Sequence, residues 1–138
     1  MIYSIDVEIT APVYDTEVTS RVEDAVSNIF PGAEPEYRHG EVTASVHSLE
    51  HFSELLHRRA ILDTARSVFF DTLQGNAFSF ALKKQAAFEG VVNFVVDEPG
   101  ELGSIVVRVR VEEPTVEEFI DYIAPPTEDG QPVVTSDE

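Results

Sequence analysis

The 138-residue sequence predicts one α+β domain with the element order β-α-β-α-α-β-β-β-α. Two strand patterns in the first half are each followed by apolar residues at helical spacing. Three strand patterns in the second half follow one another closely, and such short connections require antiparallel pairing. The length is that of one domain of typical size. We therefore expect a mostly antiparallel sheet with the helices on one face.

The first strand and the first helix are predicted within the first 32 residues. Residues 3–10 alternate between apolar and polar side chains, which is typical of a half-buried strand. Asp15 is expected to cap a helix whose apolar stripe runs from Val18 to Ile29. Pro31-Gly32 would end this helix, because both residue types interrupt helical geometry.

The second strand is predicted at residues 42–47, where apolar and polar residues alternate again. A long helical pattern follows, from a capping residue at Ser48 to a terminating glycine at Gly75. Because this pattern is unusually long for a globular helix, we expect a break at residues 57–60 and hence two helices.

The remaining elements are three strands and a helix. The strands are predicted at residues 78–82, 91–96 and 104–112, and the helix at residues 116–123. Beyond the first of these strands, Lys83 and Gln85 continue its polar face, whereas Lys84 falls on its apolar face. Lys84 would therefore extend past the core edge or mark a bulge. Residues 1–124 would form the domain and the acidic, proline-containing residues 125–138 a tail, partly docked or mobile.

The charge of the chain is strongly acidic, with 26 acidic against nine basic residues and a net charge of −17. A typical nucleic-acid-binding protein has the opposite balance, and anionic membranes would repel this surface. Scattered carboxylates with only two lysines are typical of proteins that work at molar salt, where self-repulsion is screened. We read the chain as coming from an extreme halophile; an ordinary acidic protein is the alternative.

Several classes of chemistry are excluded or disfavoured. The chain has no cysteine, no signal-peptide pattern and no apolar run long enough for a bilayer, so we expect a cytoplasmic protein. His47 and His51 have the spacing of a helical metal pair, but the expected cap at Ser48 separates them. Gly100-Glu101-Leu102-Gly103 joins two strands, and its carboxylate would repel phosphate. We predict no enzyme activity, no metal and no cofactor.

Basic residues are concentrated in one segment, in contrast to the rest of the chain. Residues 58–88 contain five basic and two acidic residues, a net charge of +3. If the strands at 78–82 and 104–112 are neighbours, Lys83 and Gln85 share an open face with Arg108 and Arg110. Such a surface would bind a phosphate backbone, or would meet the carboxylates of a second chain.

Internal ion pairing is the third reading of the same residues, because Arg59, Asp63 and Arg66 share one helix face. The sequence leaves these three readings open. Molar salt argues against binding that depends on counterion release, so any nucleic-acid contact must be close and geometrically defined.

Several short motifs in the second half resemble a small, poorly characterised archaeal family described as RNA-binding. They are Ile61-Leu62-Asp63-Thr64-Ala65-Arg66, Gly75-Asn76, Lys84-Gln85-Ala86-Ala87, Gly90-Val91, Phe94, Leu102-Gly103, Ala124-Pro125, Gly130 and Pro132. The resemblance implies a fold similar to the ribosomal protein that binds 5S ribosomal RNA, with helices on one side of a curved sheet. It also implies RNA binding by fold analogy, a docked segment at residues 124–132, and a nucleotide-kinase-like protein partner, because some members are joined to such a domain.

The combined prediction is a non-enzymatic protein that binds structured RNA through a local basic patch on an acidic surface. The predicted RNA-binding residues are Arg58, Arg59, Arg66, Lys83, Lys84, Gln85, Arg108 and Arg110. Arg66 and Lys84-Gln85 lie on the motifs of the resemblance, and the others rest on charge alone. The alternative is a homodimeric interaction module with no nucleic-acid ligand.

Overall fold

Five antiparallel strands form one open sheet in the order β2-β3-β1-β5-β4. The computed structural model describes residues 3–95, 103–128 and 131–132. The strands are β1 (Ser4–Pro12), β2 (Glu36–Arg38), β3 (Glu41–Val46), β4 (Ala77–Lys83) and β5 (Ser104–Glu113), and a separate hairpin pairs β6 (Thr127–Glu128) with β7 (Gln131–Pro132). The α+β architecture expected from the sequence is confirmed.

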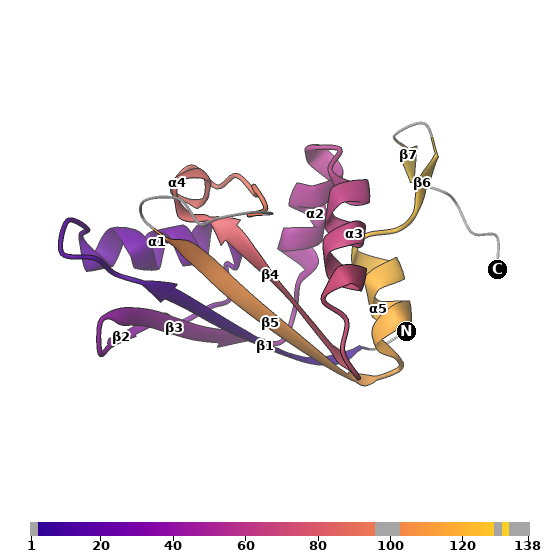
Figure 1. Ribbon diagram of the computed structural model, residues 1–138, viewed down its shortest axis with the longest axis horizontal. Helices are drawn as coiled ribbons and strands as arrows, with labels where there is room; N and C mark the ends of the chain where they lie inside the picture. Colours follow the sequence, from indigo (N-terminus) through magenta and orange to yellow (C-terminus); the bar gives the residue numbers. More distant parts are fainter. Residues whose placement is uncertain (1–2, 96–102, 129–130, 133–138) are drawn as a thin grey trace.

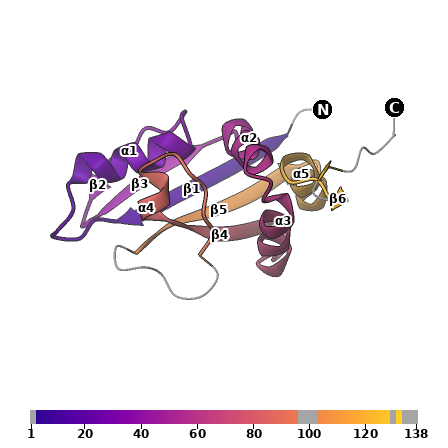
Figure 2. The same ribbon diagram turned by 90° about the horizontal axis from the view of Figure 1, so that it is seen from above.

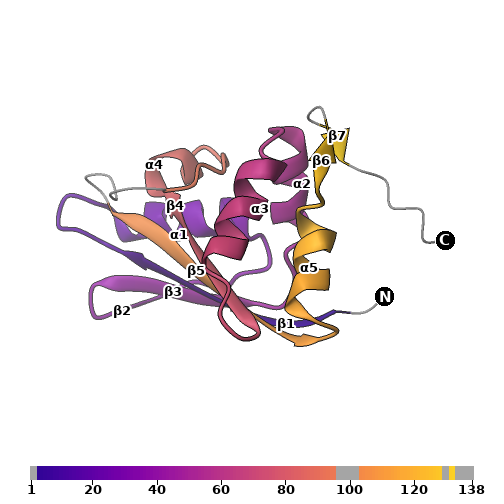
Figure 3. The same ribbon diagram turned by 45° about the vertical axis from the view of Figure 1, so that its right-hand side comes forward.

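The helices all lie on one side of the sheet, and no described segment covers the other side (Figures 1 and 3). They are α1 (Thr19–Ile29), α2 (Glu50–Arg58), α3 (Leu62–Asp71), α4 (Lys84–Ala87) and α5 (Val116–Ile123). Seen from above, α1 and α4 lie together over one end of the sheet, and α2, α3 and α5 lie over the other (Figure 2). Within the described chain, no helix has the length and apolar character needed to cross a membrane. We call the uncovered side the open face.

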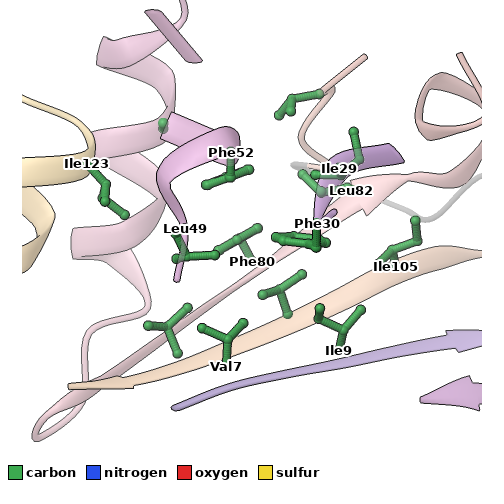
Figure 4. Packing of buried hydrophobic residues seen from close by; sticks show 14 of the residues in the cluster. Val7, Ile9, Ile29, Phe30, Leu49, Phe52, Phe80, Leu82, Ile105 and Ile123 are labelled. Carbon is green, nitrogen blue, oxygen red and sulfur yellow. The ribbon is translucent and has the colours of Figure 1, made fainter. Parts of the chain in front are cut away.

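Side chains alternate between the two faces of the sheet, and the apolar side chains on the face toward the helices form the core. Val7 and Ile9 of β1 are buried, as are Phe80 of β4 and Ile105 of β5 (Figure 4). Phe52 of α2 lies over these strands and stacks on Phe80 with 5.0 Å between ring centroids. Burying each such side chain stabilises the fold by about 1.5–3 kcal/mol relative to exposure.

The expected break in the long helical pattern is confirmed. Helix α2 ends at Arg58 and α3 begins at Leu62, and Ala60 between them has a positive φ of 53°. That left-handed conformation cannot continue a right-handed helix. The capping position of α2 is Leu49, one residue after the predicted cap at Ser48. The Ser48 hydroxyl still accepts a hydrogen bond from the N–H of Glu50, the first residue of the helix.

The predicted start of the first helix was wrong. Helix α1 begins at Thr19 after Val18, which is exposed, so neither the Asp15 cap nor the start of the apolar stripe was placed correctly. The reason is tertiary. The Glu17 carboxylate accepts hydrogen bonds from the Tyr14 N–H and the Lys84 ammonium, which holds the chain before α1 in a loop.

The prediction of a strand at residues 91–96 was also wrong for residues 91–95, which the structure describes. The chain turns at Lys84 into the short helix α4, and Phe94 forms only an isolated bridge with Leu82. The apolar residues there serve the core, since Val92 and Phe94 are buried. Residue 96 lies outside the described residues.

A short edge strand, β2, was missed from the sequence. Its three residues are all exposed, so it has no apolar pattern. The turn creates it, because His39 and Gly40 both have positive φ, 51° and 83°, as a two-residue antiparallel hairpin requires.

Candidate nucleic-acid interface

The structure distributes the eight predicted RNA-binding residues over five places. Arg58 and Arg59 lie at the α2–α3 turn, and Arg66 lies between α3 and α5. Lys83, Arg108 and Arg110 lie on the open face, whereas Lys84 lies in the interior and Gln85 on α4. The eight residues therefore do not form one continuous basic patch.

The α2–α3 turn lies in the helix layer, away from the sheet (Figure 1). Arg58 is 3.9 Å from the Glu54 carboxylate, at the limit of an ion pair, and both groups are largely exposed. Arg59 is exposed, and none of the described carboxylates lies within 4.0 Å of it. An exposed pair of this kind contributes about 0–1 kcal/mol, so it restrains these arginines little.

Arg66 holds helix α5 against α3. Its Nη1 lies 2.6 Å from the Asp121 Oδ1 and donates to the Ala124 carbonyl at 3.1 Å, and the guanidinium lies over the Phe70 ring. One turn earlier, the Asp63 carboxylate accepts a hydrogen bond from the Thr127 hydroxyl of the β6–β7 hairpin. These contacts are made to α5 and the chain that follows it, in place of a ladder of pairs within α3.

Lys84 is buried, with 1% of its surface exposed. Its ammonium donates to the Pro12 carbonyl at 2.5 Å and to the Glu17 Oε1 at 2.9 Å, and lies over the Tyr14 ring. The side chain thereby joins the end of β4 to the loop between β1 and α1. Lys84 therefore neither marks a bulge nor extends past the edge of the core, the two alternatives expected from the sequence. A phosphate has no access to its ammonium in this position.

Gln85 is exposed, but it does not share a strand face with Lys83 as predicted. Strand β4 ends at Lys83, and Gln85 belongs to α4. The polar alternation that linked the two residues in the sequence therefore stops at the strand end.

The open face carries three of the predicted cations, which we call the sheet-face cations: Lys83, Arg108 and Arg110. Strands β4 and β5 are neighbours, as expected, and Lys83 lies opposite Ser104 at the far end of their ladder. Arg108 and Arg110 lie opposite Ser79 and Ala77 of β4.

Three carboxylates lie beside the sheet-face cations, Asp6 and Glu8 of β1 and Glu112 of β5. Asp6 lies opposite Arg110 and accepts a hydrogen bond from it at 3.2 Å, and Glu112 is 3.1 Å from the same guanidinium. This hydrogen bond, and next the charge of Glu112, raise the pKa of Arg110 above its ordinary value, so it stays charged. Glu8 lies opposite Arg108 without an ion pair.

Small and uncharged side chains occupy the middle of the open face, and Glu41 of β3 with Glu36 and Arg38 of β2 adds charges toward the β2 edge. Ser79 and Ala81 of β4 and Thr10 of β1 are partly buried, and Val106 in the middle of β5 is 47% exposed. The β1–β3 part of the open face borders a hollow of about 510 Å³, which is acidic and hydroxyl-rich. Its polar lining is Glu8, Thr10, Glu34, Glu36, Thr43 and Ser45.

An aromatic cluster at the other end of β1 was not anticipated from the sequence. Tyr3 stacks on Tyr122 of α5 with 4.7 Å between ring centroids, and Tyr122 is about half exposed. Burial, followed by the charge of Glu118, raises the pKa of Tyr3. No group of three metal-ligating side chains occurs in the parts of the chain that the structure describes.

Comparison with known proteins places the chain in a family. A family model described as RNA binding matches residues 6–112. A UPF0201 protein of Thermococcus onnurineus is 36% identical over 135 residues, which cover 93% of this chain and 97% of the relative. The chain belongs to the UPF0201 family. The archaeal family expected from the sequence motifs is thus confirmed; a haloarchaeal source and likeness to the 5S-RNA-binding protein stay predictions.

A solved UPF0201 structure supports the same fold. The crystal structure of the UPF0201 protein from Methanococcus jannaschii has a TM-score of 0.88 and 36% identity, covering 94% of this chain and 99% of that one. A UPF0200/UPF0201 protein of Archaeoglobus fulgidus is 40% identical over 131 residues, but the match spans only 40% of its length.

The net charge of −17 leads to a prediction about salt. Raising KCl from about 0.1 M to about 1 M shortens the screening length from about 10 Å to about 3 Å. Self-repulsion at a net charge of −17 should then fall, so the melting temperature is expected to rise by several degrees, measured by circular dichroism. Replacing exposed Glu50, Glu54 and Glu117 with glutamine should reduce the rise; a melting temperature unaffected by KCl would contradict the halophilic reading.

Proposed function

We propose that this UPF0201 protein is a non-enzymatic cytoplasmic RNA-binding protein that contacts RNA through the open face of its sheet. The main support is the RNA-binding description of the family model, which matches residues 6–112 and so includes most of the sheet. The contacting residues in this proposal are the sheet-face cations Lys83, Arg108 and Arg110.

The open face suits a phosphate backbone better than the other four places do. Lys83 and Arg108 are exposed, and within the described chain no carboxylate lies within ion-pair distance of either. Arg108 and Arg110 are two residues apart on one strand, about 7 Å, and Lys83 lies about 13 Å further along. This row of cations crosses small side chains, which allow a backbone to approach closely.

Arginine is suited to phosphate because its planar guanidinium makes two parallel hydrogen bonds. Arg108 offers such a group without displacing an existing partner, whereas Arg110 must exchange its bond to Asp6. Direct contacts of this kind are less dependent on counterion release, which is weak at molar salt.

The turn arginines Arg58 and Arg59 provide a matched control. They lie in the helix layer, so one RNA segment lying on the open face does not reach them. Reversing two charges there changes the net charge by the same amount as reversing two sheet-face cations. Any difference between the two variants therefore reports location, not overall charge.

The test is ultraviolet crosslinking and recovery of bound RNA from cells at their native salt. Lys83→Glu with Arg108→Glu is expected to reduce recovered RNA at least about tenfold, since each lost phosphate contact weakens binding to all sequences. Arg58→Glu with Arg59→Glu should leave recovery within about twofold. Equal recovery from the first variant and the unaltered protein, both folded by circular dichroism, would contradict the proposal.

A further inference from the structure

On the open face, two acidic residues of β1 lie beside two basic residues of the neighbouring strand β5. In one row, Ser45 of β3, Glu8 of β1, Arg108 of β5 and Ser79 of β4 lie side by side. In the next row, Asp6 of β1 lies beside Arg110 of β5. In these two rows the acid lies on β1 and the base lies on β5. Beyond them, Glu112 of β5 adds a carboxylate to the open face, 3.1 Å from Arg110.

We propose that the open face pairs with the open face of a second copy of this chain. Consider a two-fold axis that lies between the sheets, parallel to the strands and midway between β1 and β5. This axis places β1 of one copy over β5 of the other, so Glu8 faces Arg108 of the partner subunit. Asp6 likewise faces Arg110 of the partner subunit, and each contact occurs twice, as an isologous interface requires.

The outer strands match under the same axis. Strand β3 lies over β4 of the second copy, which brings Ser45 against Ser79 of the partner subunit and Thr43 against Ala81 of the partner subunit. The exposed Val106 comes over Thr10 of the partner subunit. The interface thus contains small, mostly uncharged side chains around four charge contacts.

Other orientations of the axis lose this match. A two-fold axis perpendicular to the strands, through the row of Glu8 and Arg108, places Glu8 over Glu8 of the partner subunit and Arg108 over Arg108 of the partner subunit. Like charges opposed in this way cost several kcal/mol. The order of the charges therefore selects one arrangement, in which the two sheets pack face to face about 10 Å apart.

A second copy is the occupant that the charges favour. The chain carries a net charge of −17, so two copies repel each other over most of their surfaces. On the two central strands of the open face, Arg108 and Arg110 offset Asp6 and Glu8, and Glu112 leaves one carboxylate in excess, so repulsion between two copies is smaller there than over the rest of the surface. Close contacts of this kind are also screened less by salt than the long-range repulsion is.

The expected dimer is reversible. Four strands about 4.8 Å apart and seven residues long give a projected footprint of about 440 Å² on each copy. That value lies at the low end of specific interfaces, where association is weak and transient.

Self-pairing does not depend on the proposed RNA binding, but it uses the same surface. Arg108 and Arg110 cannot contact a phosphate backbone while they face the carboxylates of a second copy. If both activities hold, dimerisation covers the RNA-binding residues, and RNA and a second copy exclude each other.

A charge exchange tests the pairing by sedimentation equilibrium of the full chain in KCl. Glu8→Arg and Arg108→Glu are each expected to weaken dimerisation at least about tenfold, because each opposes like charges in the interface. The double variant Glu8→Arg with Arg108→Glu restores opposite charges across the axis, so dimerisation should return to within about threefold of the original. Arg59→Glu, in the helix layer, should have no effect.

Two results would overturn the pairing. One is an unaltered chain that stays monomeric at the highest attainable concentration. The other is a dimer on which the single charge reversals have no effect, with all variants folded by circular dichroism.

Crosslinking tests which faces meet, and the absence of native cysteine makes it selective. Ser45→Cys with Ser79→Cys places thiols three strands apart in one chain, about 14 Å, beyond a thiol crosslinker that spans about 10 Å. In the proposed dimer the same thiols face each other across the interface, so crosslinked dimers are expected on a denaturing gel. A dimer in sedimentation that gives no such crosslink would place the interface elsewhere and overturn the proposal.

The variant Glu8→Arg separates this inference from the proposed function. It removes the pairing but adds a cation to the open face, so RNA recovery should be retained or increased. Loss of dimerisation with RNA recovery intact supports pairing and RNA binding together. If dimerisation responds to the charge exchange but no RNA is recovered, the result supports the pairing and contradicts the proposed RNA binding.

Discussion

Replacing Lys84 with methionine is expected to lower the free energy of unfolding by about 3–5 kcal/mol. The substitution leaves the Glu17 carboxylate buried without its cation, and its side chain is only 5% exposed. One oxygen of that carboxylate, Oε2, already has no hydrogen-bond partner. The Pro12 carbonyl also loses the ammonium donor. Urea denaturation at fixed KCl measures the loss.

Two further variants show whether the loss comes from the buried charge. Lys83→Met, one residue earlier but exposed, should change stability by less than about 0.5 kcal/mol. Lys84→Met combined with Glu17→Leu removes both charges and should recover most of the stability, because apolar replacement of a buried pair is often neutral. Similar effects of Lys84→Met and Lys83→Met would show that the buried charge is not the cause of the loss.

Replacing Phe52 with alanine is expected to cost about 3–5 kcal/mol. Phe52 is 1% exposed and lies at the centre of the aromatic part of the core. Its ring stacks on Phe80 at 5.0 Å and on Phe30 at 5.7 Å, and meets the edge of Phe94 at 6.5 Å between centroids. The alanine variant loses these contacts and leaves a cavity between α2 and the sheet.

Phe70 supplies the matched control for this substitution. It is 37% exposed on α3, so Phe70→Ala should cost far less, about 1 kcal/mol or below. Phe52→Leu, which keeps most of the apolar volume, should fall between the two. Equal losses in Phe52→Ala and Phe70→Ala would mean that the aromatic cluster does not organise the core. Thermal unfolding in KCl gives the comparison.

The motifs that indicate the family mostly maintain the fold. Lys84 ties the end of β4 to the β1–α1 loop, and Asp63 and Arg66 tie α3 to α5 and the hairpin beyond it. Lys83 and Arg108 lie outside those motifs. They are the two sheet-face cations with no ion-pair partner among the described carboxylates. A family resemblance carried by structural residues therefore supports the fold more strongly than it supports a binding site.

Some elements were predictable because the spacing of their apolar residues directly reflects which side chains are buried. Helix α5 has the predicted bounds, since its apolar stripe and its cap, Thr115, are local features. The parity of β4 and β5 was also predictable, because side chains alternate strictly along a strand. The edge strand β2 and the helix α4 were not, since a turn and a buried ion pair define them.

The sequence by itself determined the α+β class, the antiparallel sheet, the core-facing residues and the family. These depend on local periodicity and on short motifs, which remain readable without coordinates. Tertiary structure alone decided what each cation does. Lys83 and Lys84 are adjacent in the chain, but one faces solvent and the other is sealed against Glu17. Charge is a property of the residue, whereas its partner comes from a distant segment, so only the folded chain separates a binding cation from a structural one.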